Sequence, residues 1–205
     1  MNTRVVKPDA RALEEAGALI RAGQVVGFPT ETVYGLGGNA LDGEAVKRIF
    51  AAKGRPGDNP LIVHISALDQ LSKVISGEMP ESARRLAEAY WPGPLTMIMD
   101  KADGISMEAT AGLDSVGVRF PSHPVAQAFI TACGVPVAAP SANLSGKPSP
   151  TTAAHVLADM DGRVPMIIDG GACDVGLEST VVDVRSTPVR VLRPGGDTPR
   201  MIADV

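Results

Sequence analysis

Hydrophobic positions along this chain alternate between helical spacing and short apolar runs. Residues 10–22 follow a candidate N-cap, Asp9, with apolar side chains three and four positions apart, and residues 43–53 follow Asp42 in the same way. Helical spacing recurs at 67–76, 80–90, 124–132 and 151–160. Apolar runs that predict buried strands lie at 25–28, 61–65, 95–99, 116–120, 135–139, 165–168, 179–184 and 189–193.

Strands that alternate with helices in this way predict an α/β fold. The crossovers between strands indicate a sheet covered by helices, and the closely spaced final strands indicate some antiparallel pairing. No internal repeat, low-complexity tract or linker interrupts the pattern. The chain has 205 residues, and domains commonly contain roughly 100–200 residues. We therefore predict a single domain over residues 1–205.

The composition narrows the class of protein. Hydrophobic residues make up 44% and charged residues 20%, which is typical of a globular protein and excludes wholesale disorder. The net charge of −4 argues against a dedicated duplex-binding protein, so any anionic ligand must meet a local basic patch. Neither a long apolar run nor a signal peptide is evident, and Cys133 and Cys173 form no CxxC pair. We expect a cytoplasmic protein with no membrane association.

The candidate chemistry lies in polar, glycine-rich loops that follow the apolar strands, because open α/β sheets bind ligands at the carboxyl ends of their strands. Residues 29–39 combine hydroxyls and a carboxylate with glycines, and 138–150 are rich in small hydroxylated residues. A dinucleotide fingerprint at Gly35, Gly37 and Ala40 is weak, because residues 30–34 separate it from the strand. We therefore expect 29–39 to be a ligand loop.

Two further loops contain cations suited to a polyphosphate. Lys53 and Arg55 lie among glycines and prolines at 53–60, and Arg193 closes the strand before Pro-Gly-Gly. Arg119 lies in an apolar strand and, if buried, should have an anionic partner, which is either a bound carboxylate or an internal Asp or Glu. No nucleophile with an adjacent base emerges. An enzyme with these residues would act by positioning and charge neutralisation.

Taken together, seven motifs resemble the YrdC-type family of threonylcarbamoyl-AMP synthases, and the resemblance runs from about residue 10 to 196. The family fold is a twisted sheet of parallel and antiparallel strands with helices on both faces, enclosing a basic cavity. The motifs are FPTETVYGLG at 28–37, KGRPGDNPL at 53–61, WPGPLT at 91–96, PSANLSG at 140–146, SPTT at 149–152, ESTVVD at 178–183 and LRPG at 192–195.

The resemblance also implies which residues bind each substrate. The positions that match a site for L-threonine are Thr32, His64, Arg119, the backbone at Ala139, and Ser179. The positions that match a site for ATP, or lie beside it in the same motifs, are Arg55, Asn59, Ser115, Ser141, Asn143, Ser149 and Arg193. Lys53 and Arg55 are the implied catalytic cations. The resemblance implies no metal ligand among the side chains, and Mg²⁺ enters with ATP.

The implied activity joins L-threonine, bicarbonate or CO₂, and ATP into L-threonylcarbamoyladenylate, with release of pyrophosphate. The product serves N6-threonylcarbamoyladenosine modification of transfer RNA and passes to a separate transfer complex, and direct contact with transfer RNA stays open. Longer family members append a second domain through a linker, so the linker's ATP contacts are expected to be absent or replaced here. The alternatives are a non-catalytic RNA-binding module and a YrdC-like carbamoyl-transfer domain.

Overall fold

The computed structural model describes residues 2–205, in which ten strands form one mixed sheet in the order β1-β8-β2-β3-β7-β4-β6-β5-β9-β10. Pairing is parallel for β1/β8, β2/β8, β4/β6 and β5/β9, and antiparallel for the other neighbours. The strands are β1 (Arg4–Val6), β2 (Val26–Phe28), β3 (Gly35–Asn39), β4 (Ile62–His64), β5 (Leu95–Asp100), β6 (Ser115–Arg119), β7 (Val137–Ala138), β8 (Met166–Ile168), β9 (Thr180–Asp183) and β10 (Arg190–Arg193).

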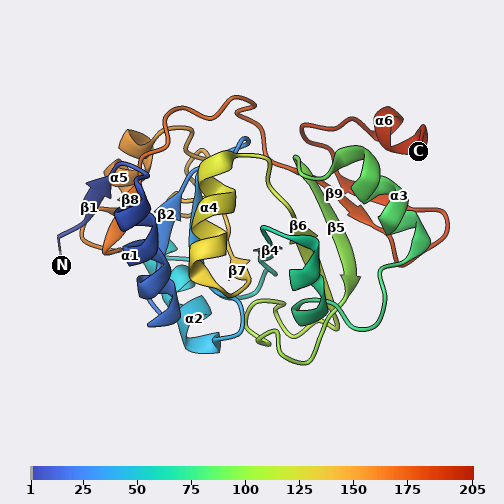
Figure 1. Cartoon of the computed structure of the whole chain (residues 1–205), viewed down its shortest axis with the longest axis horizontal. Coiled ribbons are helices and arrows are strands. Elements are labelled where there is room, and N and C mark those ends of the chain that lie inside the picture. The colour runs from blue at the N-terminus through green and yellow to red at the C-terminus, as the bar shows by residue number, and fades with distance from the viewer. Residues whose placement is uncertain (1) are drawn as a thin grey trace.

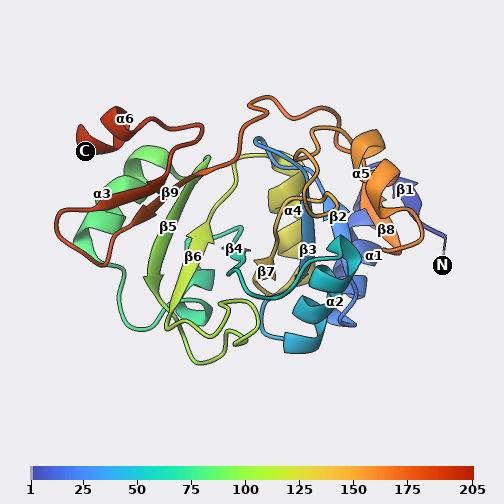
Figure 2. The same ribbon diagram turned by 180° about the vertical axis from the view of Figure 1, so that it is seen from behind.

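Helices cover both faces of this sheet. In Figure 1, α1 (Ala10–Arg21) and α4 (Pro124–Cys133) lie in front of the strands. In Figure 2, seen from behind, α2 (Gly43–Lys53) and α5 (Ala153–Met160) lie in front instead. The remaining helices are the 3₁₀ helix η1 (Leu68–Lys73), α3 (Glu81–Tyr90) and α6 (Pro199–Ala203). This arrangement confirms the predicted mixed α/β fold with helices on both faces.

The helix ends follow the capping signals of the sequence. The Asp9 carboxylate accepts a hydrogen bond from the Ala12 amide at 2.8 Å, and the Asp42 carboxylate accepts one from the Glu44 amide at 2.9 Å. Helix α2 ends at Gly54, whose φ of 61° is left-handed and suits glycine. The helix predicted at 67–76 is instead the shorter 3₁₀ helix η1.

The expectation that residues 29–39 are a loop is wrong for their second half, because Gly35–Asn39 form β3. This strand pairs with both β2 and β7 in the middle of the sheet. A Cβ at Gly37 would lie 2.8 Å from Cγ1 of Val137, and one at Gly38 would lie 2.9 Å from Cδ1 of Ile49. The glycines therefore make room for neighbouring side chains. The sequence pattern also missed β1 and α6.

Two hydrophobic clusters hold the layers together. One lies under α1 and α4 and contains Phe28, Phe129 and Ile130, with the ring centroids of the two phenylalanines 4.9 Å apart. The larger one includes Ile49 of α2 and Val156 of α5. Among residues 2–205, no helix combines the length and apolar character that crossing a membrane requires.

The packing of α1 against α4 generates a prediction at Gly17. A Cβ at this position would lie 2.4 Å from the Ala132 carbonyl oxygen of α4. We expect Gly17→Ala to lower the free energy of unfolding by about 1–3 kcal/mol, although alanine is the better helix former by about 1 kcal/mol. Urea unfolding measures the change.

The matched control is Ala18→Gly at the neighbouring exposed position of α1. It should lower the free energy of unfolding by about 1 kcal/mol through helix propensity alone. A Gly17→Ala protein as stable as the parent, or more stable, would contradict the close approach of the two helices.

Candidate functional site

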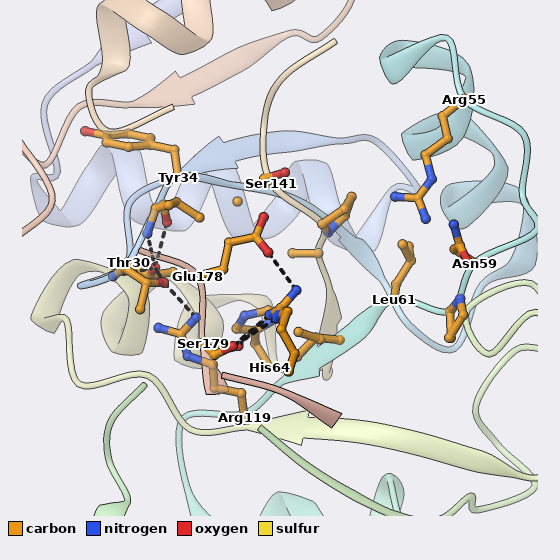
Figure 3. A pocket seen from close by; sticks show the side chains of 18 residues that line it. Thr30, Tyr34, Arg55, Asn59, Leu61, His64, Arg119, Ser141, Glu178 and Ser179 are labelled. Carbon is orange, nitrogen blue, oxygen red and sulfur yellow. Dashed lines mark hydrogen bonds and ion pairs between the residues drawn. The ribbon is translucent and has the colours of Figure 1, made fainter. Parts of the chain in front are cut away.

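A cavity of about 370 Å³ opens where four loops meet at the middle of the sheet (Figure 3). The loops are the one after β2, the one between α2 and β4, the one after β7, and the one before β9. The lining residues are Thr30, Thr32, Val33, Tyr34, Gly35, Arg55, Asn59, Pro60, Leu61, Ile62, His64, Arg119, Ala139, Pro140, Ser141, Glu178, Ser179 and Arg193.

The cavity gathers most of the site residues expected from the sequence. All five of the expected threonine-binding positions line it: Thr32, His64, Arg119, Ala139 and Ser179. Of the expected nucleotide-binding positions, Arg55, Asn59, Ser141 and Arg193 line it, whereas Ser115, Asn143 and Ser149 are outside the lining. The three cations Arg55, Arg119 and Arg193 thus share one recess, although they come from distant parts of the chain.

Arg119 is held at the carboxyl end of β6 by groups of the protein itself. Its Nη1 donates to Oγ1 of Thr32 at 2.9 Å, and its Nη2 lies 2.7 Å from Oε1 of Glu31. The side chains of Arg119 and Glu31 are only 4% and 9% exposed. Of the two partners left open by the sequence, the internal acid is therefore present.

Two threonine hydroxyls lie beside the Arg119 guanidinium. Thr30 Oγ1 donates to the Val33 carbonyl at 2.6 Å and accepts from the amides of Thr32 and Val33 at 3.2 and 3.3 Å. Thr32 Oγ1 lies 3.0 Å from Thr30 Oγ1 and accepts from Arg119 at 2.9 Å. The Thr32 hydroxyl is therefore held at the wall of the cavity, with hydrogen-bonding capacity left for a ligand.

His64 lies at the end of β4 in a fully buried environment. Its ring meets that of Phe28 edge-on, with centroids 6.0 Å apart. Burial, together with the nearby Arg119 charge, lowers the pKa of His64 to about 3. The imidazole is therefore neutral near pH 7. Its Nδ1 has no hydrogen-bond partner among the described residues, which leaves a polar atom beside the cavity.

Arg193 clamps the loop that precedes β9. Its Nε and Nη2 donate to the Ser179 carbonyl at 3.1 and 2.9 Å, and Nη2 also donates to Ser179 Oγ at 3.1 Å. Its Nη1 donates to Oε2 of Glu178 at 2.7 Å. Ser149 lies behind this pair and donates from Oγ to Oε1 of Glu178 at 3.0 Å. Ser149 therefore reaches the cavity through Glu178.

Lys53 and Asn143 support the wall of the cavity. The Lys53 ammonium donates to the Ser141 carbonyl, and to the Asn143 carbonyl at 2.8 Å. The Asn143 amide in turn donates to the Lys147 carbonyl at 2.7 Å. Burial, with a further contribution from the Arg55 charge, lowers the pKa of Lys53 to about 8. Lys53 thus ties α2 to the loop after β7, and its contact with a ligand stays a prediction.

The two ends of the cavity differ in character. In Figure 3, Arg55 and Asn59 lie at one end, Thr30, Arg119 and Ser179 lie at the other, and Ser141 and Glu178 lie between them. The Arg55 guanidinium carbon lies 5.7 Å from the centre of the Phe50 ring. This end is open, whereas the Arg119 end is buried. The cavity can therefore hold a small ligand deep inside and a larger one toward the opening.

The sequence analysis assigned no role to three residues in or beside the cavity. Glu31, Tyr34 and Glu178 were all within the quoted motifs, but their roles depend on distant partners. The Tyr34 hydroxyl donates to the Gly171 carbonyl at 2.7 Å, and burial raises the pKa of Tyr34 to about 12.

Ser115 lies at the opposite end of β6 from Arg119 and pairs with Asp100. It is the predicted nucleotide residue for which the cavity offers least support.

Comparison with known proteins identifies relatives over most of the chain. The family model for Sua5, YciO and YrdC, described as Telomere recombination, matches residues 18–195. The threonylcarbamoyl-AMP synthase of Pyrococcus abyssi is 55% identical over 88% of this chain and 53% of its own length. The synthase of Bacillus subtilis is 53% identical over 94% of this chain and 56% of its own length.

A solved structure agrees with these matches. The crystal structure of P. abyssi Sua5 complexed with L-threonine has a TM-score of 0.89 and 51% sequence identity to this chain. The match covers 95% of this chain and 57% of that one. The chain therefore spans about half the length of the curated relatives described here.

The buried imidazole of His64 generates a prediction about pH. Its pKa is lower in the folded state, about 3 against 6.5, so the unfolded chain binds more protons between these values and stability rises with pH. Acidification from pH 6 to 4 should destabilise the parent by about 1.4 kcal/mol per unit through this group. In His64→Asn this contribution to the slope disappears.

Urea unfolding of both proteins at several pH values measures the two slopes. The matched control is His155→Asn, which makes the same substitution on the exposed face of α5, outside the cavity. Equal slopes for the parent and His64→Asn would show that the imidazole is not held neutral by burial.

Proposed function

The chain belongs to the Sua5/YciO/YrdC family, and from this premise we propose that it is an L-threonylcarbamoyladenylate synthase. It would form threonylcarbamoyl-AMP and pyrophosphate from L-threonine, bicarbonate or CO₂, and ATP, as a nucleotidyltransferase in N6-threonylcarbamoyladenosine modification of transfer RNA. Residues 1–205 would act as one domain. The labile product would pass to a separate transfer complex. The names of the curated relatives support this activity and favour neither alternative.

One observation carries the proposal: a single recess brings the residues expected for threonine next to those expected for ATP. Thr32, His64, Arg119, Ala139 and Ser179 are from five separate segments, yet they line the same cavity as Arg55, Asn59, Ser141 and Arg193. A synthase that joins two substrates needs them in contact, because orientation of well-placed reactants can supply about 7–11 kcal/mol. The shared recess would hold the two substrates in contact.

The buried end suits the amino acid. Arg119 would pair with the threonine carboxylate through its remaining Nη N–H groups, while Thr32, Glu31 and the Gly93 carbonyl hold the guanidinium in place. The Thr32 hydroxyl would form a hydrogen bond with the ligand. The unpartnered Nδ1 of His64 is a further polar group for the ligand. The relative complexed with L-threonine supports the same class of ligand.

The open end suits the nucleotide. Arg55, Asn59 and Ser141 lie along it, and Arg193 lies across from them in the same lining. Within the described part of the chain, His, Cys, Asp and Glu side chains form no group of three that could hold a metal ion. The Mg²⁺ of the proposal therefore arrives on the triphosphate, as is usual for this ion. Glu178, Asn59 and Ser141 are the oxygen-bearing residues that would face it.

The chemistry would need no covalent enzyme intermediate. The threonine amine adds to CO₂ to give a carbamate and a proton, and the carbamate oxygen attacks the α-phosphorus of ATP as pyrophosphate leaves. The carbamate is labile in water, so burial of the amino-acid end would protect it. Lys53 would act with Arg55 near the nucleotide, Lys53 by holding the loop that carries Ser141. Arginine N–H groups would stabilise the developing charge.

A direct assay tests the proposed function. The purified chain is incubated with ATP, Mg²⁺, bicarbonate and isotopically labelled threonine, and mass spectrometry follows the mixed anhydride while pyrophosphate is measured in parallel. We expect both products in equal amounts, and neither when bicarbonate is omitted. Consumption of carbamoyl phosphate, or salt-dependent RNA binding without ATP turnover, would support one of the alternative functions instead.

Arg55 provides a prediction within this activity. The side chain is half-buried at the open end of the cavity and packs on Phe50. We expect Arg55→Ala to lower kcat/KM for ATP by about 10- to 100-fold, because a charge-assisted contact with phosphate contributes about 1.5–3 kcal/mol. The free energy of unfolding should change by less than about 1 kcal/mol.

The control for this prediction is Arg84→Ala on the exposed surface of α3. It removes the same charge outside the cavity and should leave kcat/KM unchanged. Pyrophosphate release at limiting ATP measures both variants. If Arg55→Ala kept the parental rate, the nucleotide would not be bound at this end.

A further inference from the structure

Within residues 2–205, which the structure describes, Glu178 is the one acidic residue in the lining of the cavity. Both of its carboxylate oxygens are occupied by residues that the family resemblance assigns to ATP. Oε1 accepts from Ser149 at 3.0 Å, and Oε2 accepts from Arg193 at 2.7 Å. The carboxylate therefore sits where the phosphates of a nucleotide would meet the same donors.

Arg193 has one N–H group left for a phosphate. The guanidinium has five N–H groups. Two point at the Ser179 carbonyl, one at Ser179 Oγ and one at Glu178, so only one on Nη1 is left. A phosphate that binds Arg193 must therefore lie beside the Glu178 carboxylate or displace it.

The backbone at Glu178 is packed closely against the turn at Gly195. A Cβ at Gly195 would lie 2.3 Å from the Glu178 carbonyl oxygen and 2.6 Å from the Ser179 carbonyl carbon, so the chain is packed tightly there. The Gly196 amide donates to the Glu178 carbonyl at 3.3 Å, and the Thr180 amide donates to the Pro94 carbonyl at 2.9 Å. The contacts with Ser149 and Arg193 hold the side chain as well, so the carboxylate stays at the wall of the cavity.

We propose that Glu178 is a specificity-determining residue that makes this cavity select the cation-complexed triphosphate over the free polyanion. The inference rests on the proposed ATP site. A free triphosphate beside Arg193 meets the like charge of Glu178, whose side chain is 42% exposed, so the repulsion is partly screened by water but still weakens binding. A divalent cation on the phosphates removes this repulsion, because the carboxylate then faces positive charge, directly or through a water of the ion.

Equilibrium binding tests this inference without turnover. Isothermal titration calorimetry with ATP, in the absence of threonine and bicarbonate, is done at constant ionic strength with Mg²⁺ and with EDTA. The parent should bind ATP about tenfold more tightly with Mg²⁺. Glu178→Gln should bind free ATP about tenfold more tightly than the parent does, so that most of the Mg²⁺ dependence disappears. Glu81→Gln, the same charge change on the exposed start of α3, should behave as the parent.

Adenosine is the uncharged probe that separates the charge of Glu178 from a structural role. Its affinity should be the same in the parent and in Glu178→Gln, because it brings no phosphate near the carboxylate. A changed affinity for adenosine would mean that the substitution disturbs the site, and it would overturn the inference. Glu178→Ala serves as a second variant with the same expectations, should the amide variant fail to fold.

The outcomes distinguish this inference from the proposed function. If the parent binds ATP equally well with and without Mg²⁺, or if Glu178→Gln binds free ATP no more tightly, Glu178 does not select the complex, and the synthase proposal stands. If the parent binds ATP in neither condition, the proposed function itself fails and the inference falls with it.

Discussion

The buried contact between Arg119 and Glu31 is the interaction on which the cavity depends. It joins the end of β6 to the loop after β2, two segments that lie far apart in the sequence but meet beneath the cavity floor. Both side chains are almost fully removed from water, where an unpaired charge costs several kcal/mol. The pair therefore fixes the direction of the guanidinium and, through it, the hydroxyl of Thr32.

The three arginines of the cavity differ in the partners that they have within the protein. Arg119 and Arg193 each contact a glutamate of the chain, whereas Arg55 packs on an aromatic ring at the open end. Two carboxylates thus offset part of the charge that three arginines bring to one recess. This balance limits the electrostatic cost of gathering like charges without a ligand. It also places the cation that packs on an aromatic ring, Arg55, at the mouth and the glutamate-paired Arg119 at the floor.

Close packing of backbone against side chains shapes the same recess. Glycines in β3 let Phe28, Ile49 and Val137 fill the centre of the sheet, and the Gly195 turn lies against the carbonyls at 178–179. Lys53 performs a comparable task from α2, because its ammonium bonds to carbonyls of the loop after β7. The loops that line the cavity are therefore held by neighbours outside it, and this support keeps the lining side chains in place.

The sequence by itself determined the α/β class, most of the helices and strands, the caps at Asp9 and Asp42, and the motifs that contain the cavity residues. These features depend on local periodicity, capping and residue type. Only the tertiary structure decided that Gly35–Asn39 form a central strand and that Glu31 is a partner of Arg119. It also decided that the Glu178 carboxylate accepts hydrogen bonds from both Ser149 and Arg193. Each of these depends on contacts between distant segments, which no local pattern of side chains encodes.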